Sequence, residues 1–243
     1  MSILVIGESC LDVFHYGECK RLCPEAPVPV FNSVDIRENG GMAMNTFNNV
    51  KVINPNVEIL TNNNWKNIKK TRFVEHNSNH MFMRLDENDN KFNRIELNLK
   101  FLNAFDAIIV SDYDKGFLHV EDLITIANSN PITFLDTKKT LGEWSLMFDY
   151  VKINGVEYDN TKDSITEDMR ENLIITQGKD GCIFKSKKFK VPLVEVKDVS
   201  GAGDTFISGL CCEFLRTKDI EKSIEFANIC ATKVVQKKGV TTI

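Results

Sequence analysis

Six short apolar runs recur along the chain, and they constrain its fold more than any other feature. They are ILVI (3–6), VEIL (57–60), AIIV (107–110), ITFL (132–135), YVKI (150–153) and LIIT (173–176). Each run is continuous rather than alternating, as in strands that are buried on both faces of a parallel sheet. Helical patterns lie between and after the runs, so the sequence predicts an α/β fold.

The C-terminal quarter of the chain predicts a pair of helices. Apolar residues follow the 3.6-residue period between 205 and 215, and the same period continues from Ile220 to Val234. Asp219 is the expected N-cap of the second helix, and Gly239 is its expected stop.

Two other segments, 17–37 and 71–97, show rough alternation of apolar and polar residues, broken by Asn and Asp. Alternation indicates strands with one solvated face, so we expect a small antiparallel sheet that forms a lid or clasp. No internal repeat or long linker divides the sequence, and 1–243 is expected to be a single domain.

Composition excludes several classes of protein. A net charge of −4 and a pI near 5.7 argue against non-specific binding to nucleic acid. No run reaches the roughly 18 apolar residues of a membrane helix, and the N-terminus resembles neither a signal nor a transit peptide. We therefore expect a soluble cytoplasmic protein without a membrane partner.

The seven cysteines are scattered and predict reduced structural thiols. Cys10, Cys19 and Cys23 lie near His15, but no C-x-x-C pair supports a metal site there.

The segment DVSGAGDTFISGL (198–210) carries the strongest chemical signal. A Gly-Ala-Gly turn that opens a helix presents successive N–H groups at the positive end of the helix dipole, which is a site for an anion. A carboxylate beside a bound phosphate, here Asp204, suits a base that takes a proton from an attacking hydroxyl. This is the logic of a kinase; the alternative is an aspartate that serves only as an N-cap.

These motifs resemble those of the ribokinase-like (PfkB) sugar kinases. The 198–210 segment is similar to the C-terminal signature of that family. Further similar motifs follow the family order: ENGGMAMN (38–45), NGVE (154–157), ITQGKDG (175–181) and EFANICA (225–231). The resemblance implies a three-layer sandwich with a mainly parallel central sheet and a small β lid.

One branch of the family, the D-glycero-D-manno-heptose-7-phosphate kinases, is the most similar. The similarity rests on VIGESCLDVFHYGECKRLCPEAPVPVF (5–31), KTRFVEHNSNHMFMRLD (70–86), VSDYDKGFL (110–118), LDTKK (135–139) and KKGVTTI (237–243). It implies an ATP-dependent transfer of a phosphoryl group to the anomeric hydroxyl of the heptose 7-phosphate, which gives the 1,7-bisphosphate for nucleotide-activated heptose.

The resemblance also implies roles for individual residues. Asp204 is the implied general base, and the implied anion site is Gly201, Ala202 and Gly203. The implied sugar-binding residues are Asp12, Gly40, Gly41 and Asn45, with Arg84, Asp112 and Lys115 near the sugar phosphate. Asp12 as a strand-end cap, Asn45 as an ordinary helix residue and Lys115 as a solvated lysine are the alternatives.

On the nucleotide side the resemblance implies that ATP is bound by Thr176, Gly178, Gly181 and Asn228. Asn154 and Glu157 would organise Mg²⁺ and its waters, because Mg²⁺ prefers hard oxygen ligands. Asp198 and Ser200 match positions that bind a monovalent cation, K⁺, in relatives. For Asn228, an ordinary polar residue on a helix is the alternative.

The chain departs from the family at two places. Only TNNNWKNIKK (61–70) stands where relatives carry a helix and a strand, and the material between NGVE and LIIT is also short. A kinase of other sugar specificity, or a weakly active sugar- or nucleotide-binding relative, therefore remains open. The sequence contains no H-x-G-H motif of a nucleotidyltransferase, so we expect a single activity, in a homodimer that pairs through the lid.

Overall fold

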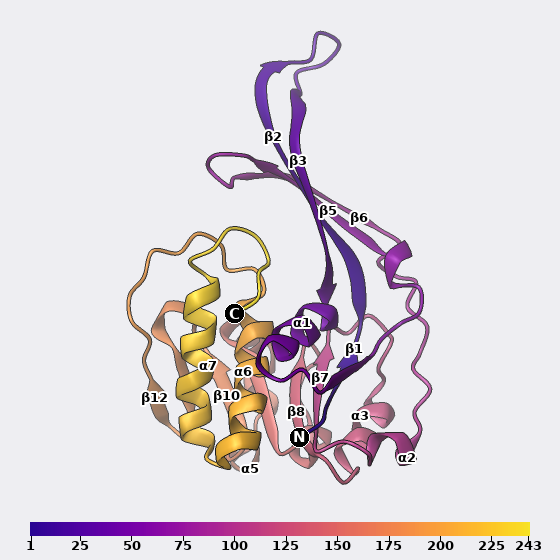
Figure 1. The fold of residues 1–243 in the computed structure, drawn as a ribbon, viewed down its shortest axis with the longest axis vertical. Helices are drawn as coiled ribbons and strands as arrows, with labels where there is room; N and C mark the ends of the chain where they lie inside the picture. Colours follow the sequence, from indigo (N-terminus) through magenta and orange to yellow (C-terminus); the bar gives the residue numbers. More distant parts are fainter.

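The computed structural model describes residues 1–243 and contains two β-sheets (Figure 1). Sheet A has eight strands, in the spatial order β12 (Lys187–Phe189), β11 (Cys182–Phe184), β10 (Leu173–Thr176), β9 (Tyr150–Asn154), β8 (Ile132–Thr137), β7 (Ala107–Asp112), β1 (Ile3–Gly7) and β4 (Val57–Leu60). Neighbours from β10 to β4 are parallel, whereas β11 and β12 are antiparallel. All six apolar runs form strands of this sheet, as predicted.

Helices cover both faces of sheet A (Figure 1). One face carries α1 (Ala43–Ile53), α6 (Ala202–Thr217) and α7 (Ile220–Val234); the other carries α2 (Leu99–Leu102), α3 (Val120–Ala127), α4 (Gly155–Thr161) and α5 (Glu167–Arg170). Successive residues of a strand enter different cores: Ile3 and Val5 belong to the first, Leu4 and Ile6 to the second. This arrangement confirms the predicted three-layer α/β sandwich.

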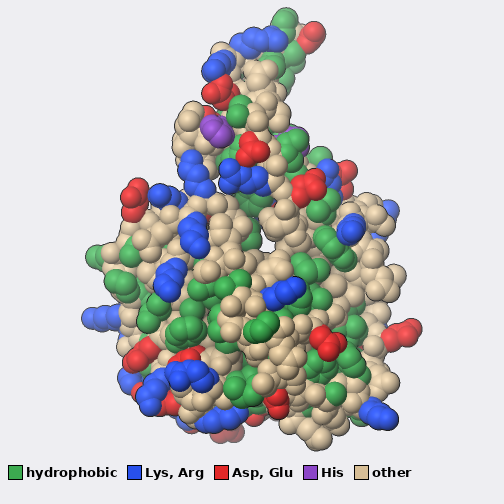
Figure 2. All heavy atoms as spheres, in the orientation of Figure 1, with side chains coloured by type: hydrophobic (Ala, Val, Ile, Leu, Met, Phe, Trp, Pro, Cys, Tyr) green, Lys and Arg blue, Asp and Glu red, His purple; other side chains and the backbone are tan.

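Sheet B forms an arm that projects from the rest of the molecule (Figure 2). Its strands, in spatial order, are β3 (Pro29–Met42), β2 (Ser9–Leu22), β5 (Lys69–Glu75) and β6 (Met81–Glu87). The β2–β3 and β5–β6 pairs are antiparallel, but β2 and β5 are parallel, so the predicted lid is a mixed sheet.

The expected strand pattern at 93–97 was wrong, because this segment forms no strand. The Ile95 side chain is buried, and its N–H donates to the carbonyl of Phe117 at 2.9 Å. An extended segment that lies on a folded body also has one buried face, and it gives the same alternation as a half-exposed strand.

The two ends of α7 differ in how well they were predicted. Asp219 is the N-cap, and its side chain accepts the N–H groups of Glu221 and Lys222. Gly239 is not the stop: the helix ends at Val234, and the Val235 carbonyl accepts hydrogen bonds from the N–H groups of residues 197 and 198. A tertiary contact with residues 197 and 198 therefore follows the end of this helix, where the sequence suggested a glycine cap.

The shortened stretch after β4 is covered by another part of the chain. Between β4 and β5 lies only a three-residue 3₁₀ turn, η1 (Trp65–Asn67), in agreement with the prediction that this stretch is too short for a helix and a strand. The segment 88–98 passes beside it on the way from β6 to α2 (Figure 1). The Asn64 amide donates to the carbonyl of Lys91 at 2.7 Å, and Phe92 packs against the core of this face. This edge of the molecule is thus closed by the chain's own residues.

The cysteines are all free. No helix combines the length and the apolar character that crossing a bilayer requires.

Gly7 ends β1 where β7 lies closest, and a side chain has no room there. An added Cβ would lie 2.0 Å from the Ser111 carbonyl oxygen and 3.1 Å from the Ala43 Cβ. We expect Gly7→Ala to lower the free energy of unfolding by about 1–3 kcal/mol, because overpacking forces the two central strands apart. Urea unfolding followed by circular dichroism measures the change.

Gly155→Ala is the matched control, because a Cβ at that helical position has no atom within 4 Å. Its free energy of unfolding is expected to change by less than about 0.5 kcal/mol. Equal effects of the two substitutions would contradict the close approach of β1 and β7.

Candidate active site

The first turn of α6 lies at the centre of the site. Gly201 is its N-cap, with φ +78°, a left-handed conformation that glycine adopts without strain. Ala202 and Gly203 then begin the helix. The N–H of Ala202 donates to the Val199 carbonyl at 3.2 Å, whereas that of Gly203 is among the donors that a helix leaves without an intrahelical partner in its first turn. Asp204 follows, with only 7% of its surface exposed. The segment forms the helix-opening turn that the sequence predicted.

The two glycines of this turn make room for protein side chains. A Cβ on Gly201 would lie 2.6 Å from the Asn45 amide nitrogen, and a Cβ on Gly203 would lie 2.9 Å from the Lys152 ammonium. Larger residues would therefore displace the Asn45 amide or the Lys152 ammonium from the turn. The neighbouring protein side chains therefore require glycine at these two positions, in addition to any ligand that approaches the turn.

Asp204 is held by two donors from separate elements. The Asn45 side-chain amide, on α1, donates to Oδ2 at 2.6 Å, and the Tyr113 hydroxyl, just after β7, donates to Oδ1 at 3.1 Å. Burial raises the pKa of Asp204 to about 6, although the hydrogen bond from Asn45 lowers it. A carboxyl with a pKa near 6 is largely ionised at pH 7 and remains a competent base.

A buried ion pair lies beneath the same turn. The Lys152 ammonium, from β9, is 2.7 Å from Oδ2 of Asp136, from β8, and the Lys152 side chain is 3% exposed. The other oxygen of Asp136 has no hydrogen-bond partner. The pair puts a positive charge under the amino end of α6, where it adds to the attraction for an anion.

A cavity of about 450 Å³ opens between this turn and the base of sheet B. Its size lies within the range of small-molecule sites. It brings together these residues that the sequence singled out: Asp12, Gly41, Asn45, Arg84, Lys115, Ser200, Gly201 and Asp204. We call it the sugar-side cavity.

Two residues expected at the sugar lie outside this cavity. Gly40 faces the Met44 side chain. Asp112 is 1% exposed, and its carboxylate accepts hydrogen bonds from Thr137 and the Lys139 ammonium. Asp112 therefore holds the ends of β7 and β8 together beneath the cavity.

Four polar residues of the cavity were missed: Lys70, Arg72, Tyr113 and Lys138. Lys70 and Arg72 are two apart on β5, and that spacing puts their side chains on one face of the strand. The alternation of segment 70–76 therefore contained the signal. Tyr113 and Lys138 lie within motifs shared with the heptose kinases, but nothing in their spacing pointed to a cavity.

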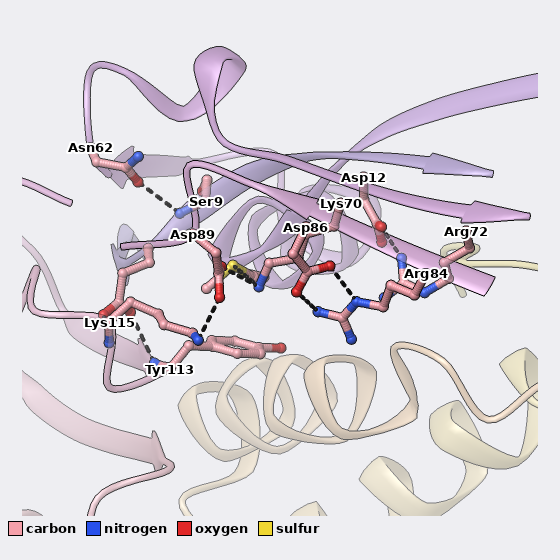
Figure 3. A network of polar contacts seen from close by, with 12 residues as sticks. Ser9, Asp12, Asn62, Lys70, Arg72, Arg84, Asp86, Asp89, Tyr113 and Lys115 are labelled. Atoms are coloured by element: carbon pink, nitrogen blue, oxygen red, sulfur yellow. Dashed lines mark hydrogen bonds and ion pairs between the residues drawn. The ribbon is translucent and has the colours of Figure 1, made fainter. Parts of the chain in front are cut away.

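The cations of the cavity are paired with carboxylates (Figure 3). Arg72 pairs with Asp12, and Arg84 pairs with Asp86. Asp89 bridges two lysines, with 3.0 Å to the ammonium of Lys70 and 2.6 Å to that of Lys115. Burial lowers the pKa of Arg72, and the charge of Arg84 lowers it further.

A second cavity, of about 280 Å³, lies on the other side of the same turn. It brings together all four residues expected at the nucleotide: Thr176, Gly178, Gly181 and Asn228. Most of its wall is apolar, with Val191, Leu193, Val199 and Phe206. Ala202 and Gly203 also line this nucleotide-side cavity, so the two cavities meet at the first turn of α6.

Asn154 and Glu157 form a capping box at the start of α4. The Glu157 carboxylate accepts both the backbone N–H and the side-chain amide of Asn154, each at 2.7 Å, and it also pairs with Lys138. The charges of Asp136 and Glu157 outweigh the effect of burial and raise the pKa of Lys138. The carboxylate and amide oxygens are the hard donors that suit Mg²⁺ through water.

The loop before α6 contains the pair expected to hold a monovalent cation. Asp198 accepts the backbone N–H of Ser200 at 2.8 Å and that of Gly239 at 3.1 Å. Its carboxylate thereby ties the C-terminal segment to the turn. No group of three or more His, Cys, Asp and Glu side chains is arranged to hold a metal ion in residues 1–243.

Comparison with known proteins agrees with this geometry. A family profile described as "pfkB family carbohydrate kinase" matches residues 145–243. A bifunctional protein HldE from Nitratiruptor sp. is 29% identical over 99% of this chain, and one from Vibrio vulnificus is 30% identical over 99%. The chain spans 62% and 61% of the length of these two relatives. The first alignment runs over 294 positions, more than the 243 residues of the chain, so it contains gaps opposite residues of the relative that this chain lacks.

Solved structures share the fold. A ribokinase from Thermotoga maritima superimposes with a TM-score of 0.74 at 15% identity, over 99% of this chain and 94% of that one. A ribokinase from Arabidopsis thaliana, complexed with ribose and ATP, gives 0.71 at 14% identity over 98% and 93%.

The predicted resemblance to the PfkB carbohydrate kinases and the ribokinase-like fold are thereby confirmed. The family match and the relatives support the predicted enzyme class, a sugar kinase that uses ATP.

The raised pKa of Asp204 has a consequence for stability. The folded pKa of about 6 lies above the ordinary value of 3.8, so the ionised carboxylate destabilises the fold above pH 6. The cost shrinks between pH 6 and 3.8 and is absent below. We expect Asp204→Asn to raise the free energy of unfolding at pH 8 by up to about 3 kcal/mol, two pKa units. Urea unfolding at pH 8 and pH 4 measures it.

Asp106→Asn is the control of opposite sign. The backbone N–H of Ser2 lowers the pKa of this exposed carboxyl. Replacing Asp106 is therefore expected to bring no increase in the free energy of unfolding at pH 8. If Asp204→Asn raised the free energy of unfolding equally at pH 4 and pH 8, the result would contradict the burial of an ionised group.

Proposed function

We propose that this chain is a kinase that transfers the γ-phosphoryl group of ATP to the anomeric hydroxyl of D-glycero-D-manno-heptose 7-phosphate. The observation that carries the proposal is the first turn of α6, which separates an apolar cavity from a cationic one. Ala202 and Gly203 line the nucleotide-side cavity, while Gly201 and Asp204 line the sugar-side cavity. A phosphoryl group that moves from one cavity to the other passes this turn.

Asp204 has the position and the pKa of the general base. Its carboxylate accepts the proton of the anomeric hydroxyl as the sugar oxygen attacks the γ-phosphorus of ATP. The new O–P bond forms while the bond to the β-phosphate oxygen breaks, and ADP leaves. The turn formed by Gly201, Ala202 and Gly203 stabilises the charge on the migrating group through its free N–H groups, and the nearby Lys152 ammonium contributes further positive charge.

The charge of the sugar-side cavity favours a phosphorylated sugar. Its cationic side chains are Lys70, Arg72, Arg84, Lys115 and Lys138, whereas only Asp12 and Asp204 are acidic. Arginine and lysine side chains are the usual ligands of phosphate. Asp12, Gly41 and Asn45 remain for the sugar hydroxyls. The choice of a heptose rests on the sequence resemblance to the heptose kinases.

The nucleotide-side cavity suits the adenosine of ATP, because its apolar wall fits the base and Asn228 offers a polar contact. Asn154 and Glu157 would hold Mg²⁺ through water, and the ion would neutralise charge on the ATP phosphates. Asp198 and Ser200 are the proposed residues for K⁺. The ATP donor and seven free cysteines are typical of a cytoplasmic enzyme.

The activity is tested with purified protein, ATP, Mg²⁺ and a panel of sugars. We expect ADP release with the heptose 7-phosphate and little with its dephosphorylated form, because the cations then have no phosphate to bind. Asp204→Asn should lower kcat by about 10²–10⁴-fold and leave ATP binding unchanged.

Two results would change the assignment. Turnover on other sugar phosphates but not on the heptose phosphate would make the chain a sugar kinase of another specificity. ATP binding without any turnover, unaffected by Asp204→Asn, would make it a binding protein.

We further propose that 1–243 is one kinase domain and that two copies pair through the lid, 17–37 and 71–97. One face of sheet B carries the cationic residues of the cavity. The register puts Ile36, His15, Phe73 and Met83 side by side on the opposite face. Ile36 and Met83 are about half exposed, at 50% and 54%. An apolar row of this kind is typical of a protein interface.

We expect a solution mass of about twice the 27.6 kDa of one chain. Met83→Glu should convert the dimer to a monomer, because it buries a charge at the interface. Val52→Glu is the control, since Val52 is equally exposed, at 55%, but lies on α1. Light scattering during gel filtration gives the masses, and a monomeric wild-type chain would contradict pairing through the lid.

A further inference from the structure

Tyr113 and Asn45 are the two side chains that contact the proposed base from the wall of the sugar-side cavity. The Tyr113 hydroxyl lies 3.1 Å from Oδ1 of Asp204, and Asn45 holds the other oxygen at 2.6 Å. Figure 3 shows the ring extended from its loop toward the helix that carries the base. Each carboxylate oxygen can accept more than one hydrogen bond, so both donors leave room for a substrate hydroxyl.

A buried glutamate fixes the loop that carries Tyr113. Glu8, at the end of β1, is fully buried. One of its oxygens accepts the backbone N–H of Tyr113 at 2.9 Å, and the other accepts that of Lys115 at 3.1 Å. Burial raises the pKa of Glu8, and the charge of Asp112 raises it further. A buried carboxylate with no cationic partner is costly to keep, and here its two oxygens hold one short loop.

The same loop reaches the cationic end of the cavity. The Lys115 ammonium contacts Asp89, which also pairs with Lys70 (Figure 3). Glu8 therefore holds, two residues apart, the tyrosine that contacts the base and a lysine that faces the proposed phosphate position.

We infer that Tyr113 is a positioning residue for the base, and that Glu8 sets the loop so that Tyr113 and Lys115 are presented together. This inference rests on the proposed role of Asp204. Tyr113 limits the rotation of the Asp204 carboxylate and stabilises its ionised form through the hydrogen bond that the Tyr113 hydroxyl donates. Burial holds the pKa of Tyr113 well above 10, so the hydroxyl remains a donor over the working range of the enzyme.

Other charged and titratable groups also face Asp204. Asp136, from β8, raises the pKa of Asp204, whereas Lys152, from β9, lowers it. Lys138, after β8, is close enough to feel the charge of Asp204, and Arg72 and Asp12 line the same cavity from sheet B. None of these changes when the Tyr113 hydroxyl is removed, so a Tyr113→Phe variant isolates one hydrogen bond.

The test compares wild-type protein with Tyr113→Phe. The substitution removes a donor that lowers the pKa of Asp204, so the acid limb of kcat/KM should move to higher pH. We expect kcat at neutral pH to fall about ten- to a hundredfold, with little change in the KM for the sugar phosphate. Tyr150→Phe is the control with unchanged activity and pH profile, because Tyr150 packs between Phe134 and Phe214.

Glu8→Gln tests the role of the loop separately from that of the Tyr113 hydroxyl. Glutamine keeps one acceptor for the loop and loses the other, so Tyr113 and Lys115 can no longer both be held. We expect Glu8→Gln to lower kcat and also to raise the KM for the sugar phosphate. Tyr113→Phe, in contrast, is expected to lower kcat and to leave this KM nearly unchanged. An effect of Glu8→Gln on kcat alone would overturn the shared role of the loop.

A measurement without turnover keeps the inference testable by itself. The ¹³C signal of the Asp204 carboxyl, identified by its loss in Asp204→Asn, should titrate at higher pH in Tyr113→Phe than in wild type. An identical titration overturns the positioning role. Failure of the proposed function is distinct: it is a wild-type protein without turnover, or Asp204→Asn with full turnover.

Discussion

The site depends on keeping one ionisable carboxylate, that of Asp204, out of water at the amino end of α6. Such burial is unfavourable unless donors and positive charge replace the lost water. Three elements supply them: Asn45 comes from α1, Tyr113 follows β7, and Lys152 comes from β9. The glycines of the turn let Asn45 and Lys152 approach. The layered sandwich is what brings three distant stretches of sequence to one carboxylate.

The cations of the sugar-side cavity are balanced by carboxylates. Each guanidinium or ammonium at the base of sheet B already has a carboxylate partner, through Asp12, Asp86 or Asp89. Pairing in this way offsets part of the repulsion among the cations in the absence of a ligand. An entering phosphate takes the place of these carboxylates. The affinity for the phosphate therefore reflects the difference between two ion-paired states, and it is smaller than the number of cations suggests.

The fold was largely predictable because its signals are local. Continuous apolar runs predicted every parallel strand of sheet A, and the period from Ile220 predicted α7 from its N-cap onward. The errors arose where a tertiary partner decides: α7 ends through contacts of its Val235 carbonyl with residues 197 and 198, and segment 93–97 lies on the body without pairing.

The candidate site was predictable where a motif carries the chemistry. The expected nucleotide residues share one cavity, and most expected sugar residues share the other. Lys138 was missed because the sequence does not distinguish a solvated lysine from an enclosed one. Asp112 was placed at the ligand, but it supports the strands, since proximity in a motif does not say which way a side chain points. The assigned roles themselves remain predictions.

The bulge in the long hairpin of β2 and β3 has a mechanical consequence. The register is unbroken from the pair Ser9–Met42 to Tyr16–Asp35, and it shifts between Tyr16 and Gly17. Asp12 lies within the unbroken part. A bulge is where a ladder bends and twists most readily. The bulge therefore bends the outer half of the hairpin relative to the inner half, while the sugar-facing half keeps its alignment with the base.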